Sequence, residues 1–125
     1  MWSPAELPGF AVFDGDECVG LVTYEIAGEA CEIVTIDALR EGAGVGTELL
    51  DAVVDAARAA GCAQVQLLTT NNNVRALAFY QKRGFHLVGL VPGAIDEQRK
   101  LKPSIPELDS AGLPIRDELH LELAL

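Results

Sequence analysis

Three glycines alternate with small residues in a short segment, Glu41 to Thr47, which reads Glu-Gly-Ala-Gly-Val-Gly-Thr. The segment follows a run typical of a strand and begins a run with helical spacing. Glycines let a backbone approach a ligand closely, and the start of a helix presents N–H groups and the positive end of the dipole. We therefore interpret the segment as a site for a phosphate, to which the Thr47 hydroxyl can contribute. The alternative is a tight turn that binds no ligand.

Two familiar phosphate-binding loops do not fit this segment. A dinucleotide fingerprint has the pattern GxGxxG, and Thr47 stands where its last glycine would be. A P-loop ends in Gly-Lys-Ser/Thr, which the segment lacks. The strand before the segment is also predicted to be antiparallel, unlike the first strand of a Rossmann unit.

A second segment, Asn73 to Phe85, reads Asn-Val-Arg-Ala-Leu-Ala-Phe-Tyr-Gln-Lys-Arg-Gly-Phe. The two segments resemble the motifs Arg/Gln-x-x-Gly-x-Gly/Ala and Asn-x-x-Ala-x-x-Phe/Leu-Tyr-x-x-x-Gly-Phe of the GNAT superfamily of acetyl-CoA-dependent N-acetyltransferases. The resemblance covers roughly Val19 to Val91. It implies an α/β (α+β) fold with a mostly antiparallel, splayed sheet and two main helices. It also implies a short member that lacks the family's first strand and helix pair.

The resemblance implies roles for individual residues. The glycine segment would bind the pyrophosphate of CoA through backbone N–H groups, and the backbones of Ile36 and Ala38 would contact the pantetheine arm. The Asn73 side chain would hold that arm, and Tyr80 would protonate the departing thiolate. For Tyr80 the alternative is a core aromatic residue. The residues implied to contact acetyl-CoA are Ile36, Ala38, Glu41, Gly42, Ala43, Gly44, Val45, Gly46, Thr47, Asn73 and Tyr80.

Two residues depart from the family pattern. Glu41 stands where the family has Arg or Gln, so a carboxylate lies near the implied pyrophosphate, with Arg40 beside it. Ala38 replaces a common proline. Together with the lacking helix pair, the Glu41 carboxylate favours a second hypothesis, a catalytically silent acyl-CoA-binding module that acts as a sensor or a partner subunit.

Acetyl transfer to an amine requires two proton movements. A primary amine with a pKa of about 10.4 must lose a proton before it attacks, and a thiolate with a pKa of about 8.5 benefits from a donor. Tyr80 is the candidate donor. Glu32 is the candidate base, because strand alternation over Cys31 to Asp37 places it on one face with Val34 and Ile36. The alternative for Glu32 is a solvated carboxylate.

The pattern of apolar residues predicts a single domain over residues 1–125 with the order β-β-β-α-β-α-β-loop-β. Alternation and turn residues indicate the strands. The predicted strands are Gly9–Phe13, Cys18–Ile26, Cys31–Asp37, Gln64–Thr70, Phe85–Val91 and Glu118–Leu125. One helix is predicted over Gly44–Ala60, and a second follows Asn73 as its N-cap and ends near Arg83.

The segment from Pro92 to Asp117 contains four of the six prolines, with helical turns expected around Ala94–Leu101. We predict that it forms a wall of the acceptor site. Its basic residues are Arg99, Lys100, Lys102 and Arg116. The alternative is a hydrophobic plug that covers bare sheet. Its members would be Leu101, Ile105, Leu108, Leu113 and Ile115.

Composition limits the partners. The chain has 125 residues, and 50% of them are hydrophobic, which excludes disorder. Its formal net charge of −10 opposes binding to nucleic acid or to anionic membranes. No secretory signal or membrane span is evident, so a cytoplasmic location is expected. A cationic amine of a small molecule or peptide suits an acidic protein best, and a homodimer is possible.

Cysteines and histidines indicate no further chemistry. Cys18, Cys31 and Cys62 show neither a CxxC pair nor an even disulfide set, so three buried thiols are expected. His86 and His120 lack a second ligand at metal-like spacing, so no metal cofactor is expected. The one co-substrate implied is acetyl-CoA as acyl donor.

Overall fold

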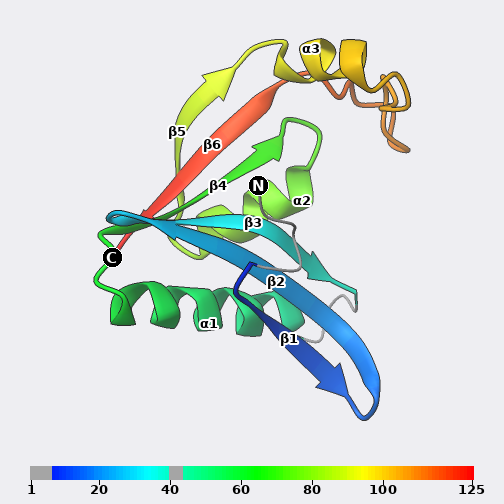
Figure 1. The fold of residues 1–125 in the computed structure, drawn as a ribbon. Coiled ribbons are helices and arrows are strands. Elements are labelled where there is room, and N and C mark those ends of the chain that lie inside the picture. The colour runs from blue at the N-terminus through cyan, green and yellow to red at the C-terminus, as the bar shows by residue number, and fades with distance from the viewer. Residues whose placement is uncertain (1–6, 40–43) are drawn as a thin grey trace. The chain divides into compact units, whose positions relative to one another are not determined.

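The computed structural model describes residues 7–39 and 44–125 (Figure 1). The strands and helices occur in the predicted order, and the expected helical turns after the fifth strand form a short helix. The elements are β1 (Gly9–Asp14), β2 (Glu17–Ala27), β3 (Ala30–Ala38), α1 (Val45–Ala59), β4 (Gln64–Thr70), α2 (Val74–Lys82), β5 (His86–Val91), α3 (Ala94–Leu101) and β6 (Glu118–Ala124). Two compact units make up the chain, residues up to Gln66 with the last two residues, and Leu67–Leu123.

The six strands form one sheet in the order β1-β2-β3-β4-β6-β5. The pairs β1 with β2, β2 with β3 and β5 with β6 are antiparallel, so the predicted mixed fold with a mostly antiparallel sheet is confirmed. Gly15 and Gly28, at the tips of the first two hairpins, have φ near 62°, a conformation that glycine adopts without strain. Among the described residues, no helix is long and apolar enough to cross a membrane.

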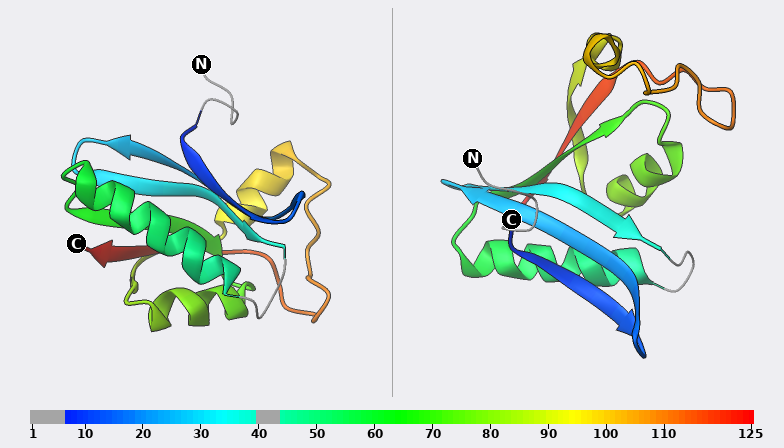
Figure 2. Two further views of the ribbon diagram at one scale, coloured as in Figure 1. Left: turned by 90° about the horizontal axis from the view of Figure 1, so that it is seen from below. Right: turned by 45° about the vertical axis from the view of Figure 1, so that its right-hand side comes forward.

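In the first unit, α1 lies along one face of β1–β3 (Figure 2). Its apolar residues recur at helical spacing and are buried. They are Val45, Leu49, Leu50, Val53 and Ala57. On β2, Gly20 permits the close approach of the helix, because a Cβ there would collide with the Val45 side chain and stand 3.0 Å from Leu49 Cδ1. A larger residue at position 20 would therefore push α1 away from the sheet.

A β-bulge interrupts the alternation of β3. Thr35 pairs with Thr23 on β2, but the next pair joins Tyr24 to Ile33, so Val34 is an extra residue. Residues paired across strands share a face, and Val22 and Tyr24 are two apart on β2. Ile36 pairs with Val22, and Ile33 with Tyr24. The bulge thus places Ile33 and Ile36 on one face, although their spacing predicts opposite faces.

The cysteines differ from the expectation of three buried thiols. Cys31 and Cys62 are buried, but Cys18 is exposed near the start of β2, so the prediction for Cys18 is wrong. The exposed thiol donates a hydrogen bond to the Gly20 carbonyl at 3.4 Å. Burial, with the neighbouring Cys62 thiol as a second cause, raises the pKa of Cys31 to about 11. Cys31 therefore stays protonated and unreactive at neutral pH.

In the second unit, α2 packs its aromatic residues against the start of β5. The Tyr80 ring lies 5.8 Å from the ring of Phe85, centroid to centroid, and both residues are buried. Between them, Gly84 has φ of 99° and lets the chain turn from helix to strand. A Cβ on Gly84 would stand 3.2 Å from Leu123 Cδ1, so α2 ends beside the leucine face of β6.

Candidate active site

The start of α1 has the geometry expected of an anion site. Gly44 precedes the helix with φ of 75°, in the left-handed region, and a Cβ built on it meets no described atom within 4 Å. The first helical turn is closed by a hydrogen bond of 3.0 Å from the Glu48 N–H to the Gly44 carbonyl. The N–H groups of Val45 and Gly46 therefore point out along the axis, as in every first helical turn. Arg40, Glu41, Gly42 and Ala43 lie outside the described residues.

Two of the predicted contacts with pantetheine lie at the end of β3. Ile36 is half-buried opposite Val22, and Ala38 is exposed opposite Gly20. Leu39 continues the ladder with a hydrogen bond of 2.9 Å from its N–H to the Val19 carbonyl. The end of β3 and the start of α1 both belong to the first of the two compact units.

The predicted face of Glu32 is wrong. Because of the bulge at Val34, Glu32 shares a face with Thr35 and lies opposite Glu25, while Ile36 lies on the face that α1 covers. On the uncovered face, the hydroxyls of Thr23 and Thr35 are 2.7 Å apart and hydrogen-bonded. Glu32 is half-buried there. Thr23, Glu25, Glu32 and Thr35 therefore form a polar and acidic strip, which suits a cationic group better than the apolar face covered by α1 does.

Asn73 and Tyr80 lie at the two ends of α2. Asn73 occupies the predicted N-cap, but its side chain makes no capping bond, and its Nδ2 instead donates to Thr69 Oγ1 at 3.2 Å. Tyr80 is 7% exposed, with the Phe79 ring in edge contact at 5.6 Å between centroids. The buried Tyr80 ring is packed against two aromatic rings, so the conformational entropy of this side chain is largely lost before any ligand binds.

Sequence reasoning missed the residue that fixes the start of this helix. Asn71 Nδ2 donates to the Pro114 carbonyl at 2.8 Å, and Oδ1 accepts the N–H groups of Arg116 and Asp117, each at 3.0 Å. The Asn71 N–H donates to the Asp117 carbonyl at 3.0 Å. The available signal was the run of three asparagines at a strand–helix junction, because asparagine side chains bond to backbone groups in such turns.

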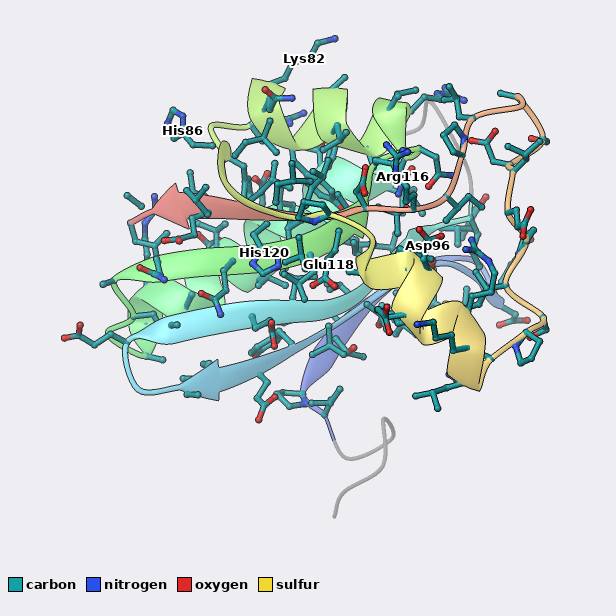
Figure 3. The ribbon with its side chains drawn as sticks, turned by 90° about the horizontal axis from the view of Figure 1, so that it is seen from above. Lys82, His86, Asp96, Arg116, Glu118 and His120 are labelled. Atoms are coloured by element: carbon teal, nitrogen blue, oxygen red, sulfur yellow. The ribbon has the colours of Figure 1, made fainter. Side chains whose placement is uncertain are left out.

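A carboxylate–imidazole pair on β6 was also missed. His120 Nε2 lies 3.1 Å from Glu118 Oε1 (Figure 3). The imidazole packs over Gly89 of β5, where a Cβ would stand 3.3 Å from His120 Cβ. The spacing of two residues along a strand puts Glu118 and His120 on one face, the face opposite Leu121. Such a pair can accept a proton from a substrate.

No group of three metal-ligating side chains occurs in the described residues.

Three of the four basic residues of the segment from Pro92 to Asp117 bond within that segment. Arg99 donates to the carbonyls of Ile105, Pro106 and Ile115 at 2.7–3.0 Å and pairs with Asp96 at 2.7 Å. Lys100 pairs with Glu97, and Arg116 with Asp117. The plug interpretation is wrong for Leu101, Leu108 and Leu113, which are exposed. The segment is therefore organised by hydrogen bonds around Arg99 and not by an apolar cover.

Neutralising Arg99 is expected to destabilise the fold. Arg99→Met leaves three carbonyls without their donor, and at 16% side-chain exposure water replaces only part of that bonding. We expect a loss of about 1.5 kcal/mol in the free energy of unfolding by urea. Lys102→Met, at an exposed position three residues later, is the matched control and should lose almost nothing. Equal stability of the two variants would contradict the role assigned to Arg99.

Two aspartates in this unit should make stability depend on pH. The backbone N–H of Leu113, with Asn72 as a second donor, lowers the pKa of Asp109, and the Gly93 N–H, with Arg116, lowers the pKa of Asp117. A carboxyl whose pKa is lower in the folded state stabilises the fold above its unfolded pKa. That stability is lost as the pH falls through the folded pKa.

The free energy of unfolding is therefore expected to decrease at pH values below the ordinary pKa of aspartate. Urea unfolding between neutral pH and pH of about 3 should show a shallower loss in Asp109→Asn and Asp117→Asn than in the native chain. Asp16→Asn, in the exposed turn between β1 and β2, is the control. Parallel pH profiles for all four proteins would exclude the two aspartates as the cause.

Comparisons with known proteins agree with both motifs. The chain matches the Acetyltransferase (GNAT) family over residues 2–85. It is 47% identical over 115 residues to the uncharacterized protein YdhI of Bacillus subtilis (strain 168), covering 91% of the chain and 72% of YdhI. The structure resembles an IAA acetyltransferase from Bacillus cereus ATCC 14579, with a TM-score of 0.80, 25% identity, and coverage of 92% of the chain and 75% of that protein. It also has the fold of a Bacillus subtilis acetyltransferase in complex with CoA (TM-score 0.78, 24% identity, 92% and 74% coverage).

Proposed function

Because the chain belongs to the GNAT family of acetyltransferases, we propose that it transfers the acetyl group of acetyl-CoA to an amine of a small molecule or peptide. The observation that supports this most is the start of α1. A glycine in the left-handed conformation stands there directly before the first turn of the helix, and a Cβ built on it meets no atom of the described residues within 4 Å. Such a turn offers N–H groups and a positive dipole end to a pyrophosphate.

The proposal assigns the donor site to backbone groups. In it, the N–H groups of the segment from Gly42 to Thr47 bind the pyrophosphate, including those of Val45 and Gly46. The backbones of Ile36 and Ala38 and the side-chain amide of Asn73 hold the pantetheine arm. Backbone N–H groups can bind an anion without a positively charged side chain. The assignment therefore suits a chain that has a formal net charge of −10 and a glutamate, Glu41, beside the glycines.

The acceptor side of the proposal uses the face of β2–β3 that α1 leaves uncovered. Glu32 and Glu25 stand opposite each other there, and their two carboxylates favour a cationic amine. In the proposal, Glu32 takes the proton that the ammonium group must lose before the nitrogen attacks the thioester carbon. The C–N bond then forms as the C–S bond breaks. Tyr80 gives its phenolic proton to the departing sulfur, and the second proton that the nitrogen loses on becoming an amide restores the phenol through solvent.

A screen of amines tests the proposal. The chain, acetyl-CoA and each acceptor are mixed, and release of the CoA thiol is followed with a chromogenic thiol reagent. The panel contains polyamines, aminoglycosides, amino acids and peptides with free N-termini. Release that depends on one amine class supports amine acetylation. Tight acetyl-CoA binding by calorimetry with no release for any amine would contradict it.

The Glu32→Gln variant shows whether the Glu32 carboxylate acts as the base or only adds negative charge to the surface. We expect kcat to fall by about 10-fold, because water reaches a half-buried site and replaces part of the base. Glu25→Gln, directly across the ladder, is the matched control and should raise only KM for a cationic acceptor. If Glu32→Gln keeps full kcat while His120→Asn loses it, the base lies on β6 and the Glu32 assignment is wrong.

One observation favours the alternative, a silent acyl-CoA-binding module. Tyr80 is buried between Phe79 and Phe85, as a purely structural aromatic residue would be. The silent module binds acetyl-CoA without turnover, so the same screen distinguishes the two functions.

A further inference from the structure

The side-chain amide of Asn73 does not make the bond that its position predicts. Asn73 is the residue directly before α2, where an asparagine oxygen ordinarily accepts a hydrogen bond from an N–H group of the first helical turn. In this structure the side chain makes no capping bond. Its Nδ2 donates instead to the Thr69 hydroxyl on β4 at 3.2 Å. A stabilising local interaction is thus given up, which is typical of functional positions.

The turn from β4 to α2 is ordered by contacts other than those of the Asn73 side chain (Figure 1). Thr70 Oγ1 donates to Asn72 Oδ1 at 2.6 Å, and Asn72 Nδ2 donates to Asp109 Oδ2 at 3.1 Å. The Asn73 N–H donates to the Thr70 carbonyl at 3.1 Å. All of these residues belong to the second compact unit. With the backbone held in this way, the Asn73 amide can turn either to the helix cap or to the Thr69 hydroxyl, and the structure shows the second orientation.

The bond to Thr69 leaves the Asn73 amide with one donor and one acceptor. An asparagine side chain has two N–H donors and a carbonyl oxygen. Thr69 uses one N–H, and the oxygen is not spent on the cap. The remaining N–H and the oxygen are the complement of one secondary amide, which has one carbonyl oxygen and one N–H. The pantetheine arm of CoA contains two secondary amides.

We propose that Thr69 is a positioning residue for donor binding. Its hydroxyl keeps the Asn73 amide away from the cap of α2, so that the amide oxygen and the second N–H bind one amide of the pantetheine arm. The role rests on the proposed function, in which the Asn73 side chain holds that arm. Thr69 acts through Asn73 and touches no reacting atom, so it affects the affinity for acetyl-CoA and not the chemical step.

Calorimetry with acetyl-CoA on three variants tests the role of Thr69. Thr69→Val keeps the β-branched shape and removes the hydroxyl. We expect the Kd for acetyl-CoA to rise roughly 5-fold with kcat unchanged, because the freed Asn73 amide returns to the cap and must leave it before the arm binds. Thr69→Ser keeps the hydroxyl and should bind as the native chain does. Thr70→Val is the matched control, since the Thr70 hydroxyl bonds to Asn72 and not to Asn73.

Three further measurements separate positioning from a purely structural role. The free energy of unfolding by urea should not fall in Thr69→Val, because the Asn73 amide can then cap α2. ADP, which has the pyrophosphate and lacks the pantetheine arm, should bind to Thr69→Val and to the native chain with the same Kd. In an Asn73→Ala background, Thr69→Val should have no further effect on the Kd for acetyl-CoA.

The outcomes separate the role of Thr69 from the proposed function. A native chain that binds no acetyl-CoA would overturn both. Normal binding by the native chain, with the same Kd in Thr69→Val, would overturn the role of Thr69 alone. An equal loss of affinity in Thr70→Val, or an equal loss for ADP, would do the same. Thr69→Ala removes the same hydroxyl and gives the same test if Thr69→Val does not fold.

Discussion

Tyr80→Phe is expected to lower kcat by about 10²-fold while the affinity for acetyl-CoA stays within a factor of about two. The change removes one oxygen and keeps the ring, so the contacts with Phe79 and Phe85 at 5.6 and 5.8 Å between centroids remain. What is lost is the proton that the proposal gives to the departing CoA sulfur. Steady-state thiol release and calorimetry with acetyl-CoA measure the two quantities.

Tyr24→Phe is the matched control for this experiment. Tyr24 is also buried and also stacks on a phenylalanine, Phe10, at 5.9 Å between ring centroids. It lies on β2, outside the motif that contains Tyr80, so kcat of the Tyr24→Phe variant should equal that of the native chain. If Tyr80→Phe is equally active, the hydroxyl serves packing alone and water protonates the thiolate.

Gly46→Leu is expected to weaken acetyl-CoA binding at least about 30-fold, which corresponds to about 2 kcal/mol. Gly46 lies in the first turn of α1, where a side chain would occupy space that the proposal gives to the pyrophosphate. The same change should raise the free energy of unfolding by up to about 1 kcal/mol, because leucine is a far better helix former than glycine. The affinity for acetyl-CoA measured by calorimetry should therefore decrease, while the free energy of unfolding measured with urea should increase.

Gly46 is a cleaner test than Gly44. The φ of 75° at Gly44 means that any side chain there adds backbone strain of roughly 1–2 kcal/mol, which would mix folding with binding. Ala59→Leu, at the exposed far end of α1, is the control for the change of residue type. Unchanged affinity in Gly46→Leu would leave the glycine segment as a tight turn.

The sequence predicted the order of elements because each strand and helix has its own periodicity. The stripe of α1 and the alternation of β6 are local patterns, and both are present in the structure. The face of Glu32 could not be predicted in the same way. A bulge shifts side chains between faces by one residue, and the bulge at Val34 depends on the register with β2, not on residues near Glu32.

The hydrogen bonds of the segment before β6 were unpredictable for a related reason. Asn71 bonds to groups 43 to 46 positions later, and Arg99 bonds to carbonyls up to 16 positions away. Residue type alone indicated a basic cluster available to a substrate. Only the folded chain shows that the Arg99 guanidinium donates to backbone carbonyls, which compete with a substrate for its N–H groups.

The Asn71 contacts also have a kinetic consequence. They close loops of more than 40 residues between the end of β4 and the start of β6, and such closure is entropically costly until both strands are in the sheet. We therefore expect the turn that leads into α2 to become ordered late in refolding, after the local hairpins of β1–β3. Substitutions at Asn71 should accelerate unfolding far more than they slow folding, with φ-values near zero.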